Sequence, residues 1–227
     1  VLDKQQPLKQ LKRFLLRREN EAGIVYCLSR KRVEKLSGQL LEMGYSAVPY
    51  HAGLTAEERK KAQEDFLRDD VRIIVATVAF GMGIDKSNIR FVVHYDIPKN
   101  IESYYQETGR AGRDGLPSEA FLLFGYGDVQ IARGLIEKAR NPDHRRIELH
   151  KLNAMIGFAE ALGCRRRVLL GYFGEKLESD CGNCDICLNP PEMIDVTEDC
   201  RKALSCVYRV GQRFGAGHVI DVLRGSE

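Results

Sequence analysis

Residues 1–125 alternate between short apolar runs and longer stretches in which apolar residues recur at helical spacing. Stripes such as Leu8, Leu11, Phe14 and Leu15 predict amphipathic helices between the short runs. Runs that are nearly continuous in apolar residues are typical of parallel strands covered on both faces. The five predicted strands are residues 23–28, 46–50, 72–77, 91–95 and 120–124. The pattern therefore predicts an α/β domain with a parallel sheet and helices on both of its faces.

Two of the predicted helices carry clear start signals. Ser29 is placed to cap a helix that Gly44 ends, because serine accepts from free N–H groups and glycine tolerates the closing turn. Thr55 and Glu58 form a capping box for a helix that runs to about residue 67. Both helices are expected to pack on the sheet.

Beyond residue 125 the strand pattern disappears. Apolar residues at helical spacing predict a helix over 145–160, and another helix begins after Cys164. Past a proline-rich linker, Thr197 is predicted to cap a helix to about residue 207, and a last helix follows over 215–223. We therefore predict three domains. They cover residues 1–125, 126–191 and 192–227.

Composition adds limits to this picture. The chain has 227 residues, a net charge of +3 and 44% hydrophobic residues, which is ordinary for a globular protein. No apolar run approaches the roughly 20 residues that span a bilayer, and no signal peptide opens the sequence, so we expect no membrane partner. Seven cysteines, an odd number, favour a reducing compartment, and we expect a cytoplasmic or nucleoid-associated protein. A first residue Val1 suggests a piece of a longer chain.

A glycine-flanked pair of arginines is the first candidate for chemistry. Arg110 and Arg113 lie three residues apart after a short predicted helix, so both would leave one side of the backbone if the helix continued. Guanidinium groups suit phosphate oxygens, and the glycines let another surface approach. The alternative is a surface turn in which Glu107 and Asp114 hold the arginines.

Further candidates follow the predicted strands, at the edge where ligands of parallel sheets bind. After Thr77 comes a glycine-bearing loop, residues 78–86, which includes Gly83. Its backbone N–H groups can approach phosphate, and its Asp85 carboxylate can accept from a sugar hydroxyl. The loop is equally readable as a tight turn. His51 follows another strand, where a structural hydrogen-bonding role is the alternative. Basic residues that begin at Arg30 stand beside the positive end of a helix dipole, which an anionic partner would relieve.

Cysteines gather in the second predicted domain. The spacing C-x16-C-x2-C-x2-C lets a helix start and one loop supply four thiolates to a tetrahedral metal. These residues are Cys164, Cys181, Cys184 and Cys187. Zinc is the predicted metal, against free thiols or a redox pair. The other cysteines, Cys27, Cys200 and Cys206, are predicted to be small core residues.

Basic residues outnumber acidic residues between positions 140 and 167. They are Arg140, Arg145, Arg146, Lys151, Arg165, Arg166 and Arg167. The run is either a solvated helix face or a contact surface for nucleic-acid phosphates.

Four segments together resemble one family. The segments 26–30, 50–54, 76–86 and 104–115, in this order, resemble the second motor domain of RecQ DNA helicases. The resemblance covers essentially the whole chain and implies a RecA-like sheet, a small helical zinc-binding subdomain and the start of a winged helix. It also implies a 3′ to 5′ ATP-dependent DNA helicase that works in replication, recombination and repair on single-stranded and duplex DNA.

Residue by residue, the same resemblance implies roles at two sites. Arg113 would be the arginine finger, Arg110 would also face the triphosphate, and Gln106 would lie at the nucleotide interface. Asp85 would approach the ribose, and the preceding Gly83 would bind the cofactor. Ser29, Arg30, His51 and Thr77 would lie along the single-stranded DNA track.

Two motifs are absent from the sequence. It contains no Gly-Lys pair of a phosphate-binding loop and no D-E-x-H box for magnesium. In the family both belong to a first motor domain, so this chain alone is expected not to hydrolyse ATP, which with Mg²⁺ would bind only in the intact enzyme. The alternatives are a non-catalytic nucleic-acid-binding adaptor derived from a helicase motor and a related RNA helicase.

Overall fold

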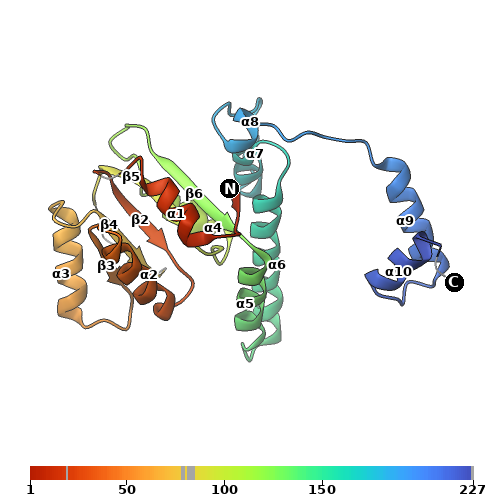
Figure 1. Cartoon of the computed structure of the whole chain (residues 1–227), viewed down its shortest axis with the longest axis horizontal. Coiled ribbons are helices and arrows are strands. Elements are labelled where there is room, and N and C mark those ends of the chain that lie inside the picture. The colour runs from red at the N-terminus through yellow and green to blue at the C-terminus, as the bar shows by residue number, and fades with distance from the viewer. Residues whose placement is uncertain (19, 78–79, 81–84, 226–227) are drawn as a thin grey trace. The chain divides into compact units, whose positions relative to one another are not determined.

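A computed structural model describes residues 1–18, 20–77, 80 and 85–225. The chain divides into two compact units, Val1–Leu188 and Asn189–Glu227. The first unit begins with a sheet domain (Figure 1). Its strands are β1 (Leu2–Asp3), β2 (Ala22–Tyr26), β3 (Ala47–Tyr50), β4 (Ile73–Ala76), β5 (Ile89–His94) and β6 (Glu119–Phe124). Its helices are α1 (Pro7–Leu15), α2 (Arg30–Glu42), α3 (Ala56–Leu67) and α4 (Ile101–Thr108).

The six strands form one sheet in the order β1-β6-β5-β2-β4-β3, and all neighbours are parallel. Strands β2, β4 and β5 are buried almost throughout, which explains their unbroken apolar sequences. Tyr26 pairs with Ala76 on one side and with His94 on the other, and Ala76 pairs with Tyr50. The segments that follow these strands therefore emerge together at the carboxyl edge of the sheet.

Helices cover both faces, as the sequence predicts. On one face α1 and α2 contribute Leu11, Leu15, Val33 and Leu36 to a core around Val25. On the other face α3 inserts the fully buried Phe66 against strand residues that alternate with those of the first core. Burial of one large side chain stabilises the fold by about 1.5–3 kcal/mol, so these two layers fix the sheet.

The rest of the first unit is helical. Helices α5 (Tyr126–Glu137) and α6 (Pro142–Glu160) lie side by side (Figure 1) and share a third core with α4, which includes Leu152 and Met155. Two short helices, α7 (Arg165–Tyr172) and α8 (Asp185–Leu188), follow. The second unit contains α9 (Thr197–Arg209) and α10 (Ala216–Leu223). The predicted fold class is confirmed.

Some expectations from the sequence are wrong. Two elements were not predicted: β1, whose two residues are too short for a pattern, and α5, because two glycines near its start suggest a break. Thr197 does not cap α9: the cap position is Val196, and the carboxylate of Asp195 accepts from the N–H of Thr197 at 2.9 Å. Cys27 and Cys206 are buried as predicted, whereas Cys200 is exposed.

Candidate functional site

The predicted DNA-contacting residues lie at the carboxyl edge of the sheet. Ser29 and Arg30 are exposed at the start of α2, where the Ser29 side chain accepts from the N–H of Arg32 at 3.3 Å. Thr77 follows β4 directly, and its N–H donates to the carbonyl of Tyr50 at 3.2 Å. These residues follow β2 and β4, which pair in the sheet, so the sheet brings them to one edge.

His51 follows β3 at the same edge but is buried. Its Nε2 lies 2.6 Å from Oε1 of Glu34, and its Nδ1 accepts from the N–H of Gly53 at 3.1 Å. Both ring nitrogens are therefore engaged inside the chain. The arrangement matches the structural alternative, and contact of His51 with DNA stays a prediction.

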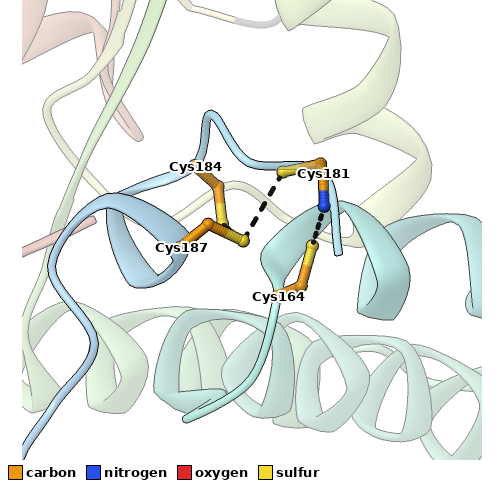
Figure 2. Close-up of side chains that lie close together, drawn as sticks. All are labelled: Cys164, Cys181, Cys184 and Cys187. Atoms are coloured by element: carbon orange, nitrogen blue, oxygen red, sulfur yellow. Dashed lines mark hydrogen bonds between the residues drawn. The ribbon is translucent and has the colours of Figure 1, made fainter. Parts of the chain in front are cut away.

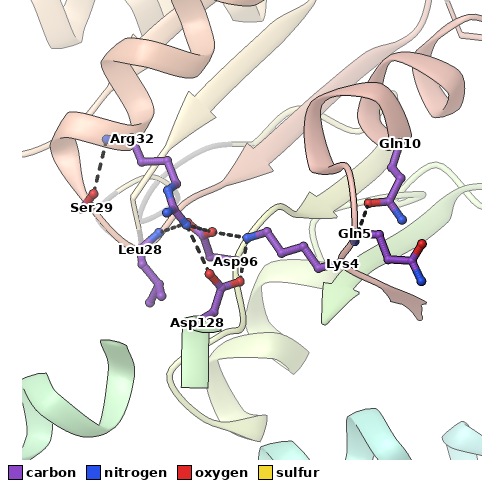
Figure 3. Close-up of polar contacts among 8 residues, drawn as sticks. All are labelled: Lys4, Gln5, Gln10, Leu28, Ser29, Arg32, Asp96 and Asp128. Atoms are coloured by element: carbon purple, nitrogen blue, oxygen red, sulfur yellow. Dashed lines mark hydrogen bonds and ion pairs between the residues drawn. The ribbon is translucent and has the colours of Figure 1, made fainter. Parts of the chain in front are cut away.

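A cluster of four charged side chains, two of them buried carboxylates, fixes the start of α2 (Figure 3). Nζ of Lys4 lies 2.6 Å from carboxylate oxygens of both Asp96 and Asp128, and Arg32 bonds the same two carboxylates. The second oxygen of Asp96 accepts from the N–H of Leu28 at 2.9 Å. The Asp96 side chain is only 1% exposed. Its burial is tolerated because the two positive charges of the cluster offset the two negative charges.

The segment that carries both arginines, residues 109–115 and called the arginine turn below, departs from the expected helix. Helix α4 ends at Thr108, and Gly112 adopts a positive φ of 70° that a side chain would strain. A Cβ on Gly112 would also lie 2.6 Å from Oγ of Ser118. The N–H of Gly112 donates to the carbonyl of Ile89 at 2.9 Å, which fastens the turn to the first residue of β5. The arginines therefore leave a sharp turn and do not share a helical face.

The turn brings two predicted nucleotide residues together. Nη1 of Arg113 lies 3.8 Å from Oδ1 of Asp85, which is almost fully exposed. Gln106 is exposed on α4. Arg110 instead lies beside the hydroxyl of Tyr26: burial raises the pKa of this phenol, and the guanidinium opposes that rise. Gly83 lies outside the described residues.

A buried pair of polar side chains joins β5 to α4. No pattern in the sequence predicted it. Nε2 of His94, the last residue of β5, lies 2.7 Å from Oε2 of Glu107 on α4. The imidazole stacks on Tyr26, with ring centroids 5.5 Å apart. Both members also line a cavity of about 300 Å³ that reaches Thr77. The only sequence signal was a charged residue within an otherwise apolar helix face.

The four predicted metal ligands converge (Figure 2). Their sulfur atoms all lie within 4.8 Å of one another. Sγ of Cys187 lies 3.4 Å from that of Cys184 and 3.9 Å from that of Cys181, while the N–H of Cys181 donates to Sγ of Cys164 at 3.3 Å. Tetrahedral zinc with bonds of about 2.3 Å places its sulfur ligands about 3.8 Å apart, so the cluster fits this ion.

Hydrogen bonds tune the thiols of the cluster. Burial opposes ionisation of Cys164, but the N–H groups of Cys181 and Arg167 outweigh it and lower the pKa to about 6. The bond with Cys184 raises the pKa of Cys187 to about 12. Thiolates so close together need a cation to ionise together, and a structural Zn²⁺ supplies that charge.

Arg165 supports the cluster from inside. Its Nε lies 2.7 and 2.8 Å from the two carboxylate oxygens of Asp185, and its Nη1 donates to the carbonyl of Phe158 at 2.8 Å. This guanidinium joins α6 to α8, and contact of Arg165 with nucleic-acid phosphates stays a prediction. Arg166 and Arg167 are exposed.

Comparisons with known proteins define first a class and then a family. Residues 6–115 match the helicase conserved C-terminal domain. A DEAD box protein from Methanococcus jannaschii has a similar structure, with a TM-score of 0.50 and 27% identity over 58% of this chain and 37% of that chain. The DEAD-box protein SrmB of E. coli has a TM-score of 0.52 at 24% identity, over 62% of this chain and 84% of that chain. The sheet domain thus corresponds to the helicase conserved C-terminal domain, and its fold is that of the DEAD-box proteins.

The remaining matches are narrower. Residues 126–188 match the RecQ zinc-binding domain, and residues 190–227 match the RQC domain. The chain is 53% identical to the ATP-dependent DNA helicase RecQ of Haemophilus influenzae and 52% identical to that of Pasteurella multocida, over 98% and 99% of its length. The chain belongs to the RecQ family and corresponds to its C-terminal region. It spans 36% of the length of these two relatives.

Among the helices of the described ranges, none is both long enough and apolar enough to cross a membrane.

Proposed function

We propose that this chain is the second half of an ATP-dependent DNA helicase that unwinds duplexes in the 3′ to 5′ direction during replication, recombination and repair. Residues 1–125 form the second motor domain, 126–191 the zinc-binding subdomain and 192–227 the beginning of a winged helix. The observation that carries the proposal is the arginine turn next to Asp85, within a chain that lacks a phosphate-binding loop. A first motor domain supplies that loop and holds Mg²⁺.

The nucleotide site in this proposal is shared between two motor domains. Arg113 reaches the γ-phosphate, where a planar guanidinium stabilises the charge of the transition state. Arg110 faces the triphosphate, and Gln106 lies at the interface. Asp85 accepts from the ribose, and the loop at Gly83 approaches the nucleotide through its backbone. The ion pair between Arg113 and Asp85 supports a common destination for these two side chains.

DNA follows the carboxyl edge of the sheet. Ser29, Arg30 and Thr77 contact the single strand. His51 either holds the neighbouring loop in place or contacts the strand directly. Arg166 and Arg167 add phosphate contacts from α7. The exposure of Ser29 and Arg30, and the position of Thr77 on a neighbouring strand, support a continuous track.

The four cysteines hold one structural zinc ion. When bound, the ion supplies the charge and the four bonds that fix a segment with little core of its own. Cys164 enters from the start of α7, and Cys181, Cys184 and Cys187 enter from one short loop and α8. A protein of this kind works on DNA inside the cell, in the cytoplasm or on the nucleoid.

The test is strand separation by the full-length protein that contains this sequence, on DNA and RNA duplexes with matched 3′ single-stranded tails. We expect ATP-dependent unwinding of the DNA duplex and DNA-stimulated ATP hydrolysis, and no hydrolysis by residues 1–227 alone. Preferential unwinding of the RNA duplex would make it an RNA helicase. Nucleic-acid binding without ATP hydrolysis would make it an adaptor.

A further inference from the structure

One arginine of β5 joins two segments of the candidate nucleotide site. Arg90 is the second residue of this strand, and its side chain is 15% exposed. Its Nη2 donates to Oδ2 of Asp114 at 2.5 Å and to the carbonyl of Ser87 at 3.2 Å. Its Nε donates to the carbonyl of Asn88 at 3.2 Å, and its Nη1 donates to that of Pro117 at 3.3 Å. All three nitrogen atoms of this guanidinium are therefore engaged inside the chain.

The acceptors of Arg90 fall into two groups. Two of them belong to residues 85–88, called the Asp85 segment below, which begins at the residue expected to approach the ribose. The other two lie at the end of the arginine turn, where Asp114 directly follows Arg113. Arg90 thus joins the Asp85 segment to the arginine turn. Between the same two segments, Nη1 of Arg113 lies 3.8 Å from Oδ1 of Asp85.

The arginine turn is fastened to β5 on both sides of Arg113. The N–H of Gly112, which precedes this arginine, donates to the carbonyl of Ile89 at 2.9 Å. Asp114, which follows it, is held by the guanidinium of Arg90. Ile89 and Arg90 are consecutive residues of one strand of the sheet, so they give both neighbours of Arg113 a common base. The position from which the Arg113 side chain starts therefore depends on Arg90.

An ordinary surface ion pair is the alternative role for Arg90. Such a pair contributes little to stability, and it needs only one carboxylate. Three of the four bonds of Arg90 go instead to backbone carbonyls, so they fix the path of the backbone. Arg18 offers a direct comparison, because its side chain is 18% exposed and also bonds carboxylates and a backbone carbonyl. Its partners, which are Glu21, Glu119 and the carbonyl of Phe14, lie outside both segments.

We propose that Arg90 is a positioning residue that holds the arginine turn and the Asp85 segment at a fixed spacing. The inference rests on the proposed function and adds the residue that aligns Arg113 with the γ-phosphate while Asp85 meets the ribose. Arg90 acts through these two residues, since its own nitrogen atoms are occupied. A misplacement of about 1 Å can lower the rate of a reaction about 10²-fold, so the spacing of the two segments matters for turnover.

The test compares Arg90→Ala and Arg90→Lys with Arg18→Ala in the full-length protein. Lysine keeps a charge that can pair with Asp114, but its single nitrogen cannot bond both segments as the guanidinium fork does. Arg18→Ala is the matched control, because it removes an equally shielded guanidinium that holds neither segment. We measure kcat and KM for DNA-stimulated ATP hydrolysis. In residues 1–227 we measure the melting temperature and the hydrogen exchange of the arginine turn.

For both Arg90 variants we expect kcat to fall about 10- to 100-fold while KM stays within about threefold, because the misplaced group acts on the transition state. Arg18→Ala should change neither constant by more than about twofold. In residues 1–227, Arg90→Lys should melt within about 4 °C of the wild type, since it keeps the ion pair. The Arg90 variants should speed hydrogen exchange in the arginine turn, and Arg18→Ala should not.

Unchanged kcat in either Arg90 variant would overturn the assignment, and so would an equal loss of kcat in Arg18→Ala. A KM that rises as much as kcat falls, or unchanged hydrogen exchange in the arginine turn, would overturn it too. If Arg90→Ala does not fold, the kcat of Arg90→Lys decides alone. A wild-type protein that does not hydrolyse ATP would instead refute the proposed function, and the positioning role with it.

Discussion

The sheet domain and the cysteine segment reach order by different means. The sheet is fixed by two layers of buried side chains, in which Phe66, Ile74 and Phe91 are almost inaccessible. Between residues 161 and 188, all of which the structure describes, Cys164 alone is buried. Hydrophobic burial therefore holds the candidate nucleotide and DNA residues, whereas ligand bonds must hold the cysteine segment.

The largest expected effect follows from removing the metal. Chelation, or Cys184→Ser, should unfold residues 161–188, because structural zinc contributes about 10–16 kcal/mol of apparent folding free energy in small sites. Elemental analysis should give one zinc per chain before treatment and none after it. Far-ultraviolet circular dichroism should keep the sheet signal. A zinc-free chain with an unchanged melting profile would contradict the comparison.

The same site predicts a pH dependence. The pKa of Cys164 lies below its ordinary value in the folded chain, so its thiolate adds stability at high pH. That stability is lost as the pH falls from 9.0 towards about 6, where the folded thiol takes up a proton. Zinc release followed with a chromogenic chelator should rise as the pH falls through about 6, where a proton competes with zinc for the Cys164 thiolate. Release that is flat down to pH 5 would refute this assignment.

The next effect belongs to the sheet domain. Asp96→Ala should destabilise the first unit by about 2–3 kcal/mol, because the largely buried Lys4 would keep only Asp128 as a counter-charge and the N–H of Leu28 would lose its acceptor. The control is Asp143→Ala, which removes a carboxylate from an exposed pair 3.8 Å from Arg146 and should cost no more than about 1 kcal/mol. If both variants lost the same free energy of unfolding in urea, burial of the charge network would not determine how much its ion pairs stabilise the fold.

A smaller effect compares two threonines at helix starts. Thr55 accepts from the N–H of Glu58 in a complete capping box, so Thr55→Ala should cost about 1 kcal/mol. Thr197 is the first residue of α9 and not its cap, so Thr197→Ala keeps the bond of its N–H to Asp195, loses only an exposed hydroxyl contact and should cost less than about 0.5 kcal/mol. Denaturant titration of both variants checks the pair. A loss at Thr197 as large as that at Thr55 would contradict the capping geometry.

The smallest effect concerns DNA binding by this chain. Replacing both Arg166 and Arg167 with alanine should lower the slope of log affinity against log salt by up to about 1.4, or about 0.7 for each lost contact with single-stranded DNA. The matched control replaces Lys60 and Lys61, two exposed lysines on α3. Fluorescence anisotropy gives both slopes. An unchanged slope in the arginine variant would make these residues a solvated face.

Patterns in the sequence predicted most of the sheet because burial leaves a direct record of apolar spacing. Strand β4 and the capped helix α3 are close to their predicted bounds. The cysteine spacing likewise predicted the cluster, since ligands separated by two residues must share a turn. Contacts between distant segments left no such record. The position of Arg110 beside Tyr26 depends on how α4 crosses the sheet, and no local pattern encodes that crossing.

The central claim is that Arg113 completes a nucleotide site shared with a first motor domain. The most direct test is ATP turnover and ATP affinity of Arg113→Ala in the full-length protein, with Arg113→Lys beside it. We expect turnover to fall by about 10³–10⁵ while affinity changes only a few-fold, because an arginine finger acts mainly on the transition state. Lysine should rescue little, since a point charge lacks the guanidinium fork. Unchanged turnover, or an equal loss of ATP binding, would contradict the claim.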